Sequence, residues 1–123
     1  SNGNTENEID HAEIRALHRL SQMGKRIDPA TITLYCTLEP CLMCFSAILL
    51  AGIPRVVYAY EDVMGGGTSI NRKQLTPIYR NASMHLTAGV RREKSLALFQ
   101  LFFQNPDNGY LKGSYLAEYT LRQ

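Results

Sequence analysis

Two cysteines stand three residues apart, directly after a proline and at the mouth of an apolar segment: Pro40, Cys41 and Cys44. Proline is favoured at the first position of a helix, because its missing N–H group would have no partner there. The sequence predicts a buried helix over residues 40–51 that ends at Gly52. Residues three apart share a helix face, so both thiols can reach one metal ion. The positive end of the helix is expected to lower their pKa.

An imidazole and a carboxylate stand two residues apart near the start of the chain, at His11 and Glu13. Helical periodicity predicts a helix over residues 10–23, with Asp10 as its N-cap and His11 in its first turn. Taken alone, a histidine at a helix start is more often ordinary surface chemistry than a metal ligand. The carboxylate beside it and the downstream cysteine pair reverse that weighting.

Two other residues with ligand chemistry are interpreted as structural. His18 lies about 10 Å along the helix from His11, at ~1.5 Å per residue, too far to share a metal with bonds to nitrogen of about 2 Å. Cys36 falls on the apolar face of a strand predicted over residues 31–38 and is interpreted as a core thiol. The alternative is that Cys36 is a fourth metal ligand, which would close the site.

The two motifs carry a resemblance to a known family. Residues 11–17 read HAEIRAL and residues 37–44 read TLEPCLMC, which together hold the H-x-E…P-C-x-x-C signature of zinc deaminases. With RVVY at residues 55–58, the chain resembles the cytidine deaminase-like superfamily and, within it, bacterial tRNA adenosine deaminases most of all. The likeness is strong in the first half of the chain and thin after Gly67.

The resemblance implies roles for individual residues. His11, Cys41 and Cys44 would bind one Zn²⁺, and a catalytic zinc keeps its fourth position for water. Glu13 would carry the catalytic proton, taking it from the water and returning it to the base and the departing amine. Asp62 matches by position a family residue near the substrate backbone. Without the likeness, Asp62 would be interpreted as an ordinary loop residue in solvent.

Strand, helix and strand over residues 31–38, 40–51 and 55–60 predict a βαβ unit with parallel strands. Ligand sites in such sheets lie at the carboxyl ends of the strands, and the first strand leads directly into the cysteine motif. A further strand is predicted over residues 84–90 and a helix over residues 91–104. The resemblance implies a three-layer α/β/α sandwich of the cytidine deaminase-like fold. Its N-terminal helix and first two strands have no counterpart in this sequence.

The length of 123 residues suits one domain with a real core, interpreted as a zinc-dependent deaminase domain over residues 1–123 that is incomplete at its N-terminus. The longest nearly apolar run, residues 41–53, falls well short of the roughly 20 residues of a membrane span. Three cysteines, two of them at metal-ligand spacing, favour a reducing cytoplasmic setting over a disulfide framework. The strand over residues 31–38 would have an unpaired edge, which either sequence before Ser1 or a second subunit is expected to cover, and a homodimer is the expected assembly.

Net charge is only +2, so the chain as a whole is not predicted to be a strong binder of polyanions. Its cations are unevenly spread, however, and a local cluster of them could contact phosphates. A solvated charged face is the equally open alternative. Within residues 70–94 the cluster consists of Arg72, Lys73, Arg80, Arg91, Arg92 and Lys94.

These features predict a zinc-dependent hydrolytic deaminase of an amino-nucleobase, with adenosine in tRNA as the first expectation. A free nucleobase or nucleotide deaminase, acting on guanine, cytosine or deoxycytidylate, is the alternative, because residues 68–123 diverge from the tRNA branch. A second alternative is a non-enzymatic module in which zinc only staples the fold. Glu13 speaks against it, since a structural zinc site has no use for a free carboxylate.

Overall fold

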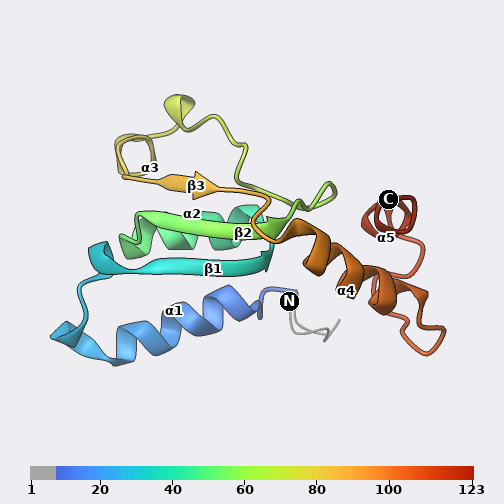
Figure 1. Cartoon of the computed structure of the whole chain (residues 1–123). Helices are drawn as coiled ribbons and strands as arrows, with labels where there is room; N and C mark the ends of the chain where they lie inside the picture. Colours follow the sequence, from blue (N-terminus) through green and yellow to red (C-terminus); the bar gives the residue numbers. More distant parts are fainter. Residues whose placement is uncertain (1–7) are drawn as a thin grey trace.

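The computed structural model describes residues 8–123 and shows strands and helices packed around one sheet (Figure 1). No helix in this part of the chain is long and apolar enough to cross a membrane. The helices and strands, in chain order, are α1 (Ala12–Gln22), β1 (Thr33–Leu38), α2 (Leu42–Ala51), β2 (Arg55–Tyr60), α3 (Pro77–Arg80), β3 (His85–Thr87), α4 (Arg92–Gln104) and α5 (Tyr115–Leu121).

The described strands form a parallel sheet in the order β1-β2-β3. Val56 at the centre of β2 pairs with Leu34 of β1 on one side and with Leu86 of β3 on the other. The predicted α/β class and the parallel βαβ unit are therefore confirmed. Among residues 8–123, β1 has β2 as its one neighbour, so the predicted unpaired edge is present as well.

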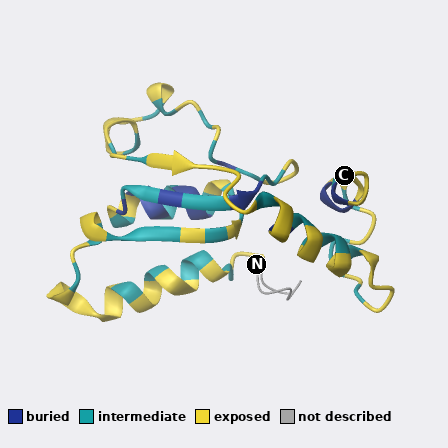
Figure 2. Ribbon diagram, viewed as in Figure 1, coloured by how far each residue is buried: buried dark blue, intermediate teal, exposed yellow. Residues whose placement is uncertain are grey.

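The main core lies between the sheet and the helices α1 and α2. Ile48 of α2, Ile53 and Val56 are fully buried there, and Leu17 of α1 packs against them. Figure 2 shows this burial concentrated on α2 and β2, while the outer side of α1 stays exposed. Gly52 ends α2 as predicted, with a φ of +79° that favours glycine.

A second cluster lies at the carboxyl end of β2, where α4 and α5 pack (Figure 1). The ring of Tyr60 is fully buried and stacks on Phe99 of α4, with 5.6 Å between ring centroids. Tyr119 of α5 packs on the same ring, and the Tyr60 hydroxyl shares a 3.0 Å hydrogen bond with that of Thr120. This cluster fixes α4 beside the end of the sheet where ligand sites are expected.

Both motif helices begin later than predicted. Cys41 is the N-cap of α2 and its backbone is extended, because it pairs with Gly66 in an antiparallel bridge. Pro40 therefore lies before the helix, and its predicted place at the first helical position is wrong. His11, rather than Asp10, is the N-cap of α1, since the Asp10 carboxylate accepts a 2.7 Å hydrogen bond from Arg15 instead.

The third strand is shorter than the predicted range of residues 84–90 and ends at Thr87. Gly89 has a φ of +77°, a left-handed conformation that glycine adopts without strain and that interrupts the extended strand, while the N–H of the next residue, Val90, donates to the Tyr58 oxygen of β2 at 3.3 Å. Arg91 follows as the N-cap of α4. The turn thus delivers α4 to the carboxyl end of the sheet.

Candidate metal centre

The structure brings the three predicted metal ligands together from places 30 and 33 residues apart. His11 precedes α1, Cys41 precedes α2, and Cys44 lies in the first turn of α2. The His11 Nδ1 atom lies 3.5 Å from the Sγ of Cys41 and 3.3 Å from the Sγ of Cys44. All three ligand atoms lie within 4.8 Å of one another. Cys44 is fully buried, whereas the other two side chains are half-buried.

These separations fit a tetrahedral zinc ion. With bonds of about 2.05 Å to nitrogen and about 2.3 Å to sulfur, the nitrogen and sulfur ligands of such an ion lie about 3.5 Å apart. A set of one imidazole and two thiol ligands also binds zinc in preference to harder metals. Within residues 8–123, Cys36 lies outside the cluster, so the cluster does not include the side chain that would close the site.

The thiol of Cys44 sits in an environment that disfavours charge. Burial raises the pKa of the Cys44 thiol, and the carboxylate of Glu13 and the thiol of Cys41 raise it further. The expectation that the helix N-terminus lowers this pKa is therefore wrong, because desolvation and neighbouring negative charge outweigh the helix dipole. A dication would reverse the balance, since metal binding displaces the thiol protons.

A cavity of about 1020 Å³ opens over this cluster. Its lining includes the polar side chains of His11, Glu13 and Cys41, together with apolar side chains of α4. Glu13 is the second residue of α1, which places its carboxylate beside the ligands. Burial raises the pKa of the Cys36 thiol in the cavity wall to about 11, and Glu13 adds to the shift, so Cys36 is an inert thiol.

Comparisons with known proteins decide the family. Residues 1–104 match the model of the MafB19-like deaminases. The chain belongs to this family. A tRNA-specific adenosine deaminase of Haemophilus influenzae is 34% identical over 94 residues, which cover 76% of this chain and 54% of that protein. A tRNA-specific adenosine deaminase of Streptococcus pyogenes serotype M18 is 31% identical over 96 residues, which cover 78% of this chain and 60% of that protein.

Membership of the MafB19-like deaminases confirms the resemblance predicted from the His-x-Glu and Pro-Cys-x-x-Cys motifs. The chain spans between half and two thirds of the length of the two relatives described. The metal cluster lies inside the matched residues.

Asp62 lies at the cavity wall, but its carboxylate is engaged within its own loop. It accepts hydrogen bonds from the backbone N–H groups of Met64 at 3.0 Å and Gly65 at 2.9 Å. The carboxylate therefore shapes the turn that follows β2. Its predicted contact with substrate stays a prediction.

Glu39, directly before the cysteine motif, is a site residue that sequence reasoning missed. Its carboxylate accepts hydrogen bonds from the backbone N–H groups of Asp62 and Thr68, both at 3.2 Å, and from the Thr68 hydroxyl at 2.6 Å. The signal in the sequence is weak: a single acid follows a strand and precedes a proline. Nothing local indicates that a loop some 25 residues later returns to it.

The predicted basic cluster does not form one free patch. Arg72 donates to the backbone oxygens of Tyr79 and Ala82, both at 2.8 Å. Arg80 donates to the Leu75 oxygen at 3.3 Å, and Arg92, the third arginine bonded within the chain, forms an ion pair with the carboxylate of Glu61. Half of the six cations thus serve the fold. The exposed remainder is Lys73, Arg91 and Lys94.

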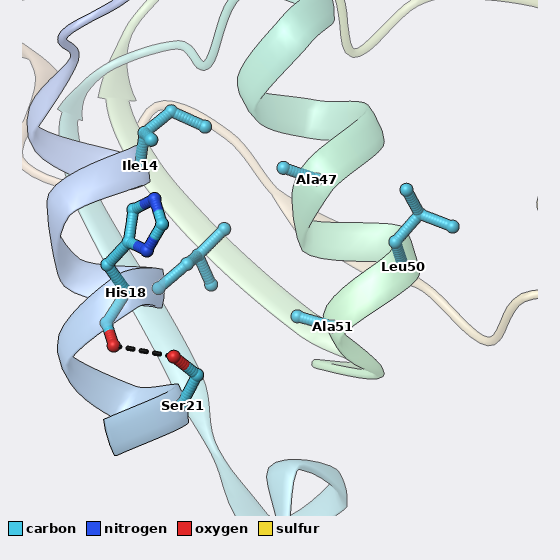
Figure 3. A pocket seen from close by; sticks show the side chains of 7 residues that line it. Ile14, His18, Ser21, Ala47, Leu50 and Ala51 are labelled. Atoms are coloured by element: carbon cyan, nitrogen blue, oxygen red, sulfur yellow. Dashed lines mark hydrogen bonds between the residues drawn. The ribbon is translucent and has the colours of Figure 1, made fainter. Parts of the chain in front are cut away.

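A second, smaller cavity of about 320 Å³ lies between α1 and α2, and none of the proposed metal ligands lines it (Figure 3). Its lining is mainly aliphatic, with Ile14 and Leu17 from α1 and Leu50 from α2. His18 lies at its α1 side, and its backbone oxygen accepts a 2.7 Å hydrogen bond from Ser21. His18 is absent from the metal cluster, in agreement with its interpretation as structural.

Proposed function

We propose that the chain is a zinc-dependent hydrolytic deaminase of an amino-nucleobase. The observation that carries the proposal is the cluster of His11, Cys41 and Cys44 beside a large cavity, which His11, Cys41 and Glu13 help to line. Membership of a deaminase family supports it. A module in which zinc only staples the fold gives no reason for a carboxylate at this place.

His11, Cys41 and Cys44 would hold the zinc, which when bound supplies a Lewis acid that lowers the pKa of water from 15.7 toward ~7. Two thiolates nearly neutralise the ion, so a nearby base is useful. Glu13 would take one proton from the attacking water and deliver it to the ring nitrogen, and would then pass the second proton, from the hydroxyl on the attacked carbon, to the departing amine. The oxygen of water joins the amine-bearing carbon, the C–N bond breaks, and ammonia leaves.

The aromatic part of the cavity lining suits a flat aromatic substrate. Phe99, Phe102 and Phe103 of α4 form it, and Phe102 is 41% exposed. Aromatic side chains stack on the faces of nucleobases, and an apolar wall keeps bulk water from the reacting atoms. The cavity lining therefore combines polar side chains for the chemistry with apolar side chains that would contact the rest of the base.

Adenosine in tRNA is the substrate we propose first, because relatives at 34% and 31% identity are named tRNA-specific adenosine deaminases. A free nucleobase or nucleotide is the second candidate. It is favoured by the internal bonds of Arg72, Arg80 and Arg92, which leave fewer cations for a phosphate backbone. We further propose that residues 1–123 act as one deaminase domain in the cytoplasm, as a homodimer.

Ammonia release from a panel of substrates tests the function. The panel consists of an adenosine-bearing tRNA anticodon stem-loop, guanine, cytosine and deoxycytidylate, each incubated with zinc-loaded protein. Release from the stem-loop alone would support the tRNA substrate, and release from a free base or nucleotide alone would replace it with the second candidate. If ammonia were released from none of the four substrates, the remaining interpretation would be the non-enzymatic module in which zinc only stabilises the fold.

A further inference from the structure

The loop formed by residues 62–68, here called the clasp loop, folds back over the start of α2. The backbone N–H of Gly67 donates to the Pro40 oxygen at 2.9 Å. Gly66, its neighbour, pairs with Cys41 in an antiparallel bridge. The clasp loop thus contacts the backbone of a proposed metal ligand, Cys41, and of Leu42, the first residue of α2.

The contact is so close that only glycine fits. A Cβ atom at Gly67 would lie 2.3 Å from the Cα of Leu42, 2.4 Å from its backbone nitrogen and 2.8 Å from the carbonyl carbon of Cys41. All three are backbone atoms, which cannot swing aside as a side chain can. By contrast, a Cβ at Gly65 would meet only the end of the Asp62 side chain, at 3.3 Å.

Glu39 anchors the clasp loop from the strand side. Its carboxylate accepts from the backbone N–H of Asp62 at the beginning of the loop and from both the N–H and the hydroxyl of Thr68 at its end. Hydrogen bonds to an ionised group are about twice as strong as neutral ones. Both ends of the clasp loop are therefore tied to the residue two positions before Cys41.

The two cysteines differ in what holds them. Cys44 is fully buried and lies within the first turn of α2. Cys41 lies before the helix with an extended backbone (φ −70°, ψ 172°), so the helix alone does not fix the direction of its side chain. Outside the helix, the backbone of Cys41 is held by its bridge to Gly66 of the clasp loop.

We propose that the clasp loop, anchored by Glu39, positions Cys41 for metal binding and so sets the affinity of the site for zinc. The inference rests on the proposed metal site and deepens it, by assigning positioning roles to Glu39, Gly67 and Thr68. Loss of residues that orient metal ligands typically costs 10–100-fold in metal affinity, and a change of that size is expected here.

The test compares zinc affinities of matched variants, measured by competition with a chromophoric chelator. Gly67→Ala places a methyl group against the backbone of Leu42, and Gly65→Ala in the same loop is its control. Thr68→Val removes the hydroxyl that donates to Glu39, whereas Thr68→Ser keeps it. The absorption of Co²⁺-loaded protein reports thiolate ligation, and circular dichroism of the metal-free protein reports the fold.

Gly67→Ala is expected to weaken zinc binding by about 10–100-fold and to reduce thiolate-to-cobalt absorption, while Gly65→Ala binds like the wild type. Thr68→Val is expected to bind more weakly, with affinity restored in Thr68→Ser. If Gly67→Ala does not fold, the Thr68 pair decides. Folded variants that all bind zinc with wild-type affinity would overturn the positioning role. A wild type that binds no zinc would instead overturn the proposed function itself.

Discussion

Glu13 is the residue on which proposed turnover depends. Glu13→Gln should keep the fold and the metal but lose at least ~10²-fold in rate, because an amide cannot accept and return the proton. Ammonia release under saturating substrate, together with zinc content and melting temperature, measures this. Glu118→Gln, at an exposed position of α5, is the control. A Glu13→Gln variant that keeps more than about a tenth of the activity would exclude Glu13 as the general base.

The cysteines allow a second test at the same scale. Cys44→Ser should abolish binding of one zinc per chain, since it removes a buried ligand from the cluster. Cys36→Ser should retain the zinc, because Cys36 lies outside the cluster. Elemental analysis of the two purified variants measures the difference. Loss of zinc from Cys36→Ser would show that the ligand set is wrong.

Single residues were predictable where the signal is local. His11 and Cys44 could be identified because each stands in a short local motif, in which the spacing along a helix and the ligand chemistry are both visible. Glu39 and Gly67 could not be, because their roles come from a contact between segments some 25 residues apart. The pKa of Cys44 was also missed, since it depends on burial and on Glu13 approaching from another helix.

At the scale of elements, an ion pair joins the end of β2 to α4 and α5. Arg92 donates to the Glu61 carboxylate at 2.6 Å and 2.8 Å, and the Tyr119 hydroxyl donates to it at 3.0 Å. The Arg92 guanidinium also lies 5.2 Å from the centre of the Tyr60 ring. These contacts fix the helix that forms the apolar wall of the cavity.

The ion pair predicts an acid-dependent loss of stability. Hydrogen bonding from Arg92 lowers the pKa of Glu61 from 4.5 to about 2. The stabilisation is therefore complete above about pH 4.5 and is lost as the pH falls toward 2. Because both side chains are 33% exposed, Glu61→Gln should cost only about 1–3 kcal/mol at pH 7.

Urea denaturation between pH 7 and pH 2.5 measures that dependence. The wild type should lose more stability than Glu61→Gln over the acid range, whereas Glu93→Gln, at an exposed position of α4, should follow the wild type. Equal slopes for wild type and Glu61→Gln would contradict the lowered pKa.

Elements themselves were largely predictable, and their ends were not. Alternation of apolar residues placed β1, which begins at Thr33 and not at residue 31. Apolar runs placed α2 and β2. The start of α2 was misplaced because the bridge from Cys41 to Gly66 keeps Cys41 extended. The length of β3 was overestimated because the strand ends at Thr87, just before the left-handed turn at Gly89, and a glycine in a strand pattern does not by itself indicate such a turn.

At the scale of the whole molecule, the tRNA proposal predicts salt-dependent binding through cations that remain exposed. Arg91 and Lys94 lie at the start of α4, beside the carboxyl end of the sheet (Figure 1). Their joint replacement by Ala should weaken binding of a tRNA anticodon stem-loop and reduce its salt dependence, by ~0.7–0.9 log units per lost phosphate contact for each tenfold change in salt.

The matched control is the double variant Arg19→Ala with Lys25→Ala, which removes the same amount of charge. These two residues lie at or just after the C-terminal end of α1, which is the end farther from α4 (Figure 1). Titrations at two salt concentrations compare both double variants with the wild type. Binding that is undetectable, or that does not change with salt, would favour the free nucleobase or nucleotide. The fold-level prediction of an α/β protein came from periodicity, but no pattern could show which cations the fold itself would use.

The dependence of ammonia release on zinc is the most direct test of the proposed chemistry. The protein is stripped with a chelator, restored with one equivalent of Zn²⁺ per chain, and assayed on each of the four panel substrates before and after restoration. The proposed function predicts ammonia from at least one substrate with the zinc-loaded protein, none with the stripped protein, and recovery after restoration. Equal release by the stripped and the loaded protein, or no release by protein shown to hold one zinc per chain, would contradict it.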